Sequence, residues 1–154
     1  MTCEGKHNGP LGLVGVAVCA AALSLTAPVA AGSTDAFFET GTKINVPSGQ
    51  EIMFLDVIEG EDSAVGTAIR VRFLAPRIAR DSGDVEFMQA EEDMATLCQD
   101  YVLPQMVNTG IAMPAQIIIV LSDRVVEHGM TDPDATQFFE AYRPESGMCV
   151  WEGF

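Results

Sequence analysis

The stretch Val85–Asn108, VEFMQAEEDMATLCQDYVLPQMVN, is the one long part of this chain with helical periodicity. Its apolar residues recur at spacings of three and four, so they share one face of a helix. Those residues are Phe87, Ala90, Met94, Leu97, Cys98 and Tyr101. The other face is polar, with Glu91, Glu92, Gln99 and Asp100, as in a helix that lies on a sheet with one side in water. We predict a helix from Val85 to Leu103 that ends or kinks before Pro104, which lacks an amide proton.

Segments with the pattern of β-strands precede and follow this helix in the sequence. The segment Ala68–Leu74 alternates apolar residues with Arg70 and Arg72, which is typical of a half-buried strand. The run Ala115–Leu121, AQIIIVL, is apolar nearly throughout and indicates a central strand covered on both faces. Further strands are indicated at Ile52–Glu59 and in a terminal hairpin about Pro144–Gly147. The sequence therefore predicts an α+β fold in which one long helix packs on a mostly antiparallel sheet of four to five strands.

Residues 1–31 have the order of a secretory signal peptide. The segment Leu11–Leu25 is almost uninterrupted apolar sequence, preceded by a polar stretch with Lys6 and followed by small residues before Gly32. We predict cleavage before Gly32. An uncleaved anchor is the alternative, but this apolar core is short for a membrane span. Lipid attachment at Cys19 is a second alternative, although a branched valine precedes it where such sites have a small residue.

The mature chain of about 120 residues suits a single domain. We predict a flexible segment over residues 32–46 and one α+β domain over residues 47–154, exported to the periplasm or secreted. The formal charge of −14 would repel phosphate backbones, so we expect no nucleic-acid partner. A solvated surface is the simplest interpretation of this acidity, and attraction to a basic partner is the alternative. Contact with the membrane is expected only through the leader before cleavage.

Two cysteines, Cys98 and Cys149, remain once the leader is removed. An even pair in an oxidising compartment predicts a disulfide between the helix and the last strand. The functional alternative is a cysteine nucleophile with His128 as its base. A zinc site is not expected, because these residues supply at most three of the usual four ligands. No cofactor and no metal are expected.

Two further sequence features have competing interpretations. The consecutive acids Glu91, Glu92 and Asp93 are predicted to form a solvated surface near the start of the helix. In a strand, Cys149 and Trp151 share one face. If Cys149 is bridged inward, Trp151 also points inward, so we predict that this tryptophan belongs to the core and is not a binding platform.

Several segments resemble a small uncharacterised family of exported alphaproteobacterial proteins. The resemblance rests on Leu97-Cys98, on Leu121-Ser122-Asp123-Arg124, and on the ending from Thr136 to Phe154. It implies export and no particular activity. Some sequences of this kind carry the name acetolactate synthase. That name does not suit this chain, because a thiamine-diphosphate enzyme needs several large domains and a cofactor-binding segment.

The sequence therefore predicts a small exported binding or interaction module without catalytic activity, with an unidentified protein as its possible partner. The alternative is a small hydrolase or thiol enzyme that uses Cys98 or Cys149 with His128.

Export has a direct test. We expect the protein recovered from the periplasm to begin at Gly32, because the apolar core precedes a run of small residues. Intact-mass analysis measures this. A mass that retains Met1 to Ala31 would show that the leader stays attached as an anchor.

Overall fold

The computed structural model describes residues 39–63 and 66–153. The predicted signal peptide, its cleavage site and Cys19 lie outside the described residues. Among the described residues, no helix combines the length and the apolar character that a membrane span requires.

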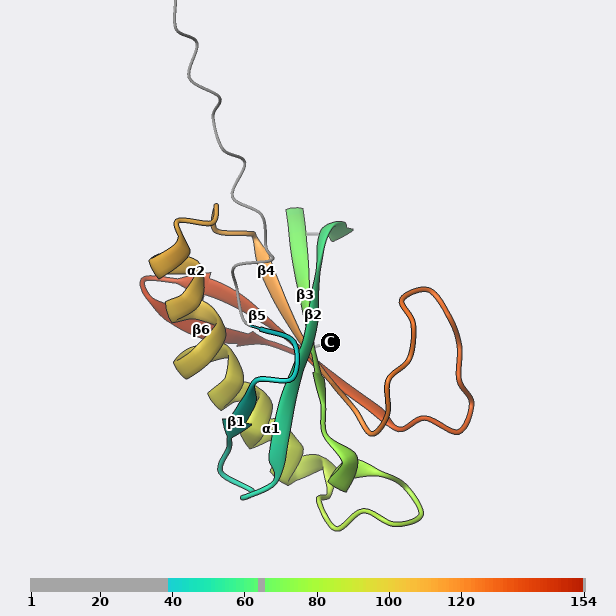
Figure 1. The fold of residues 1–154 in the computed structure, drawn as a ribbon. Helices are drawn as coiled ribbons and strands as arrows, with labels where there is room; N and C mark the ends of the chain where they lie inside the picture. Colours follow the sequence, from blue (N-terminus) through green and yellow to red (C-terminus); the bar gives the residue numbers. More distant parts are fainter. Residues whose placement is uncertain (1–38, 64–65, 154) are drawn as a thin grey trace, which may run out of the picture. The chain divides into compact units, whose positions relative to one another are not determined.

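The described chain forms one mixed sheet of six strands with a helical crossover (Figure 1). The strands are adjacent in the order in which they occur along the chain. They are β1 (Lys43–Asn45), β2 (Glu51–Ser63), β3 (Gly66–Leu74), β4 (Gln116–Ser122), β5 (Gln137–Glu145) and β6 (Met148–Glu152). The predicted α+β class is confirmed, whereas the predicted count of four to five strands is too low.

The additional strand lies in the segment predicted to be flexible. Strand β1 falls within residues 32–46 and pairs antiparallel with β2, with Ile44 opposite Ile52. Only 2% of Ile44 is exposed, so burial of this side chain holds β1 against β2. Four of the five strand pairs are antiparallel, and β3 and β4 are parallel. The parallel pair follows from the helix between them, because a crossover returns the chain in the same direction.

The predicted helix is continuous across Pro104. It consists of α1 (Phe87–Thr96), a π-helical turn (Leu97–Val102) and α2 (Leu103–Thr109). The amide of Leu103 donates to the carbonyl of Cys98, five residues earlier. This wider turn precedes the residue without an amide proton and accommodates its ring, which in a regular helix would clash with the carbonyl four residues before it. The helix therefore continues past its expected end at Pro104, and the π-helical turn interrupts its regular geometry before the proline.

The helix covers one face of the sheet, and the loop between β4 and β5 (residues 123–136) projects on the other side, in orange in Figure 1. The predicted alternation in β3 is confirmed, because Val71 and Phe73 are fully buried while Arg70 and Arg72 are partly exposed. Strand β4 lies centrally between β3 and β5, as predicted. Its apolar residues on the helix side are Ile117, Ile119 and Leu121, all fully buried.

Glycines with positive φ shape strand β2 and the turn between β5 and β6. Gly60 lies inside β2 with φ of 78°, at a register shift between Ile58 and Glu61. This conformation is that of a β-bulge, which glycine accommodates without steric cost. The predicted terminal hairpin is confirmed. Its two-residue turn has positive φ at Ser146 and Gly147, as the twist of a tight hairpin requires.

The predicted disulfide is confirmed. Cys98, in the π-helical turn, is bonded to Cys149 in β6, with their Cα atoms 6.1 Å apart. Cys98 is fully buried. The bond attaches the middle of the helix to the last strand of the sheet.

Opening this bond should destabilise the domain. The bridge closes a loop with a sequence separation of 51, worth about 4 kcal/mol through the restricted unfolded chain. We expect Cys98→Ser, Cys149→Ser and the double variant to melt at similarly lowered temperatures, because either single change opens the bond. Calorimetry measures this. A melting temperature of the native protein that reductant leaves unchanged would contradict the expectation.

Candidate functional site

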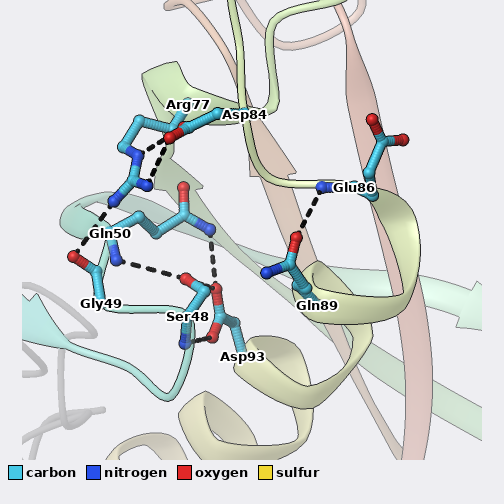
Figure 2. A network of polar contacts seen from close by, with 8 residues as sticks. All are labelled: Ser48, Gly49, Gln50, Arg77, Asp84, Glu86, Gln89 and Asp93. Carbon is cyan, nitrogen blue, oxygen red and sulfur yellow. Dashed lines mark hydrogen bonds and ion pairs between the residues drawn. The ribbon is translucent and has the colours of Figure 1, made fainter.

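A buried carboxylate holds the turn before β2 against the helix (Figure 2). Asp93 in α1 is fully buried. Its Oδ1 accepts from the main-chain N–H of Ser48 at 2.9 Å. Its Oδ2 accepts from the Ser48 hydroxyl at 2.6 Å and from the Gln50 amide at 2.7 Å. The predicted solvated position is therefore wrong for Asp93, because the turn preceding β2 folds over it and supplies three donors.

An ion pair continues this network toward the surface. Arg77 donates two hydrogen bonds to the carboxylate of Asp84, at 2.6 and 2.7 Å, and one to the carbonyl of Gly49. The hydrogen bonds from Arg77 hold the pKa of Asp84 below its ordinary value. Figure 2 shows the Gln50 amide between this ion pair and Asp93. Its Oε1 is the buried side-chain oxygen that lacks a hydrogen-bond partner among the described residues.

The network has the geometry of an anchor. Ser48 has a carboxylate beside its hydroxyl, but a serine nucleophile also needs a base to take up its proton. The histidine in the described part of the chain is His128, in the loop of residues 123–136. Asp93 accepts from three donors, so its lone pairs are used to hold the turn in place.

The residues of the predicted thiol chemistry lie apart. Cys98 and Cys149 are bonded to each other on the helix side of the sheet. His128 lines a groove with Arg70 and Arg72, which project from the other side. The structure brings together the two cysteines and does not bring His128 to them. Among the described residues, no group of three or more His, Cys, Asp or Glu side chains could hold a metal ion.

The groove with His128 lies between the sheet and the loop of residues 123–136, and we call it the loop groove. Its volume is about 500 Å³. Apolar surface comes from Val120, Met130 and Phe139, and polar groups come from Arg70, Glu127, His128 and Gln137. Met130 is 65% exposed and Phe139 53% exposed, so apolar side chains stand in water at its mouth.

Arg72 holds the loop over the sheet. Its guanidinium makes two hydrogen bonds to the carboxylate of Asp56 on β2. A third goes to the carbonyl of Val126 in the loop, at 2.7 Å. The Arg72 side chain is mostly buried, with 14% exposed. A charge-assisted contact of this kind is stronger than a neutral hydrogen bond, so the wall of the groove has a fixed position.

The start of the loop is fixed by Asp123. Burial acts to raise the pKa of Asp123, but hydrogen bonds from Arg124 and from the main-chain N–H of Thr136 outweigh it and leave the pKa below its ordinary value. Asp123 therefore joins the two ends of the loop through its ionised carboxylate. Its main-chain N–H also donates to the carbonyl of Thr136, at 3.0 Å.

Trp151 does not belong to the core, contrary to the prediction. It lies opposite Tyr142 in the β5–β6 pair and is 55% exposed, on a strand that pairs with β5 alone among the described residues. Its indole N–H donates to the Oε2 of Glu140 at 2.6 Å, and Glu140 itself is only 6% exposed. Burial raises the pKa of Tyr142 far above its ordinary value, and the charges of Glu140 and Glu91 add to the shift.

The sequence did not indicate Asp93, Glu140 or the loop groove. Asp93 looked like one of three exposed acids, and Glu140 like the polar half of an alternating strand. The available signal was the alternation of side chains along β5. Phe139 and Ala141 point to one face and Glu140 to the other, which places a carboxylate on the face that the helix covers.

Comparison with known proteins shows the family. The model of a family described as "Family of unknown function (DUF6497)" matches residues 21–154. The chain belongs to this family, which confirms the resemblance to an uncharacterised group of proteins. No curated protein and no solved structure gives a significant match.

The anchoring role of Asp93 is testable. Asp93→Asn should lower the free energy of unfolding by about 2 kcal/mol. The NH2 group of asparagine would face a hydrogen-bond donor of the turn, and the charged acceptor would be lost. The matched control is Glu92→Gln, at an exposed neighbouring position, which should change stability by less than about 0.5 kcal/mol. Urea unfolding of the oxidised protein measures both. Equal effects of the two changes would show that Asp93 is no anchor.

Proposed function

We propose that this member of the family is a small exported binding module without catalytic activity, and that the loop groove is its ligand site. The observation that carries the proposal is the fixed wall of this groove. Arg72 ties the Val126 carbonyl to the sheet, and exposed apolar groups stand beside polar ones in a space of about 500 Å³. Small-molecule sites typically have such volumes and combine an apolar lining with a few positioned polar groups.

The lining indicates the chemistry of a ligand. Phe139 and Met130 would contact an apolar part of it, and Gln137 and His128 would contact polar atoms. Arg70 adds a positive charge to a chain with a formal charge of −14. A ligand with an apolar body and an acidic or carbonyl group fits this combination.

A second concave surface is less suited to this role. It lies between β2, β3 and the segment after α2, with a volume of about 560 Å³. Its lining includes Ile69, Ile111, Met113 and Pro114 and is mainly apolar. Few polar groups converge there to orient a ligand, so the loop groove is the better candidate.

The disulfide supports an exported module over a thiol enzyme in two ways. The disulfide between Cys98 and Cys149 is the kind of bond that persists in oxidising compartments, in agreement with the proposed cleavage before Gly32. The same bond leaves neither cysteine as the free thiolate that nucleophilic catalysis requires.

The binding site can be tested with 8-anilinonaphthalene-1-sulfonate, an aromatic anion whose fluorescence rises in apolar sites. We expect saturable binding to the mature protein. Phe139→Ser should weaken the binding at least about fivefold, because the ring supplies the apolar wall. The matched control, Val125→Ser, alters a side chain of the loop of residues 123–136 that is 67% exposed but does not line the groove, and it should bind as the native protein does.

Thermal melting of each variant shows whether it remains folded. If the probe binds equally to the native protein and to Phe139→Ser, the loop groove is not the site. Weakening by Val125→Ser to the same extent would show general loosening of the loop.

A further inference from the structure

Trp151 combines exposure with a fixed orientation. More than half of its surface is in water, yet its indole N–H is bonded to the buried Glu140. Gly153 lies against the six-membered ring, since a Cβ atom at that position would come within 2.8 Å of the ring atom Cη2. The ring is therefore held from two sides and presents an aromatic surface to solvent.

The surroundings of this ring are acidic. The chain has no lysine, arginine or histidine from Asp81 to Asp123, a span that includes the whole helix. Glu140 contacts the indole, and Glu91 acts electrostatically on the neighbouring Tyr142. The arginine of the terminal hairpin, Arg143, is bonded to Glu145 and Glu152. A cation is the ligand that an aromatic ring beside carboxylates attracts.

Trp151 lies on the edge strand of the described sheet, β6. Among the described residues, β6 pairs only with β5. The N–H of Cys149 points away from β5, because it donates to the Gln99 side chain at 2.9 Å. Main-chain groups two residues apart point the same way in a strand, so the N–H and C=O of Trp151 also face the open edge.

We propose that the β6 edge binds an extended basic segment of a partner protein, with a lysine or arginine side chain stacked on Trp151. The main chain of the partner pairs with the main chain of Trp151, and its cationic side chain lies on the same face as the indole, near Glu140. Strand addition of this kind takes affinity from main-chain hydrogen bonds and specificity from alternate side chains. This surface lies on a different face from the loop groove, so the proposal is independent of the ligand proposed there.

The test uses the emission of Trp151, which is the single tryptophan of the chain and therefore reports on this site alone. The probe is a short capped peptide of alternating lysine and valine. We expect a saturable change in emission on addition of this peptide to the mature, oxidised protein. The same peptide with glutamate in place of lysine should give no change, because it carries the wrong charge for the site.

Variants separate a specific site from general attraction to an acidic protein. By calorimetry, Trp151→Leu should bind the lysine peptide about tenfold more weakly at unchanged net charge, and Trp151→Phe should keep part of the affinity. Gly153→Ala should also weaken binding, because its methyl group displaces the ring from Glu140. A lysine peptide with methylated main-chain amides should lose binding if the segment adds as a strand.

Three results would overturn the proposal. The first is equal affinity of the native protein and Trp151→Leu for the lysine peptide. The second is equal binding of the methylated peptide, which would exclude strand addition. The third is a Trp151 emission that changes on dilution of the protein alone, which would show that a second copy of this chain occupies the edge.

Discussion

Burial of one helix against six strands is the constraint on which the rest of this structure depends. The helix is attached at three places along its length: Phe87 packs edge-to-face on Phe138, Asp93 holds the turn before β2, and Cys98 is bonded to β6. These attachments reach three different parts of the sheet. Because the helix is also the crossover between β3 and β4, its position determines the parallel pair at the centre of the sheet.

The sequence predicted the parts whose signals are local. Alternation in β3, the apolar run in β4 and the three-four spacing of the helix each depend on residues close together in the chain. The disulfide was also predictable, because both cysteines lay on apolar faces and the chain offered one even pair once the leader was removed. Composition and the leader made the oxidising compartment an expectation before any contact was known.

The remaining features depend on partners far away in the sequence. Asp93 is buried because a turn 45 residues earlier covers it, and no pattern around Asp93 contains that information. Pro104 is tolerated because the preceding turn widens, so a rule for regular helices failed. Trp151 shares the face of Cys149, as predicted, but it lies on the edge strand and is 55% exposed. The alternation of side chains along a strand predicts the face to which a residue points. Whether that face is covered depends on how other elements pack on it.

The two faces of the sheet have opposite chemical character. The helix side carries the acids of a span without a single basic residue, whereas Arg70, Arg72 and Arg143 alternate onto the other side with β-strand periodicity. On that side Arg72 is bonded to Asp56 and Val126, and Arg143 is bonded to Glu145 and Glu152. Arg72 and Arg143 thus hold the loop and the hairpin in place, and the helix has no basic residue of its own. A charged partner would therefore be attracted to the side with Trp151, and a smaller ligand with an apolar part would find fixed walls on the side with the loop.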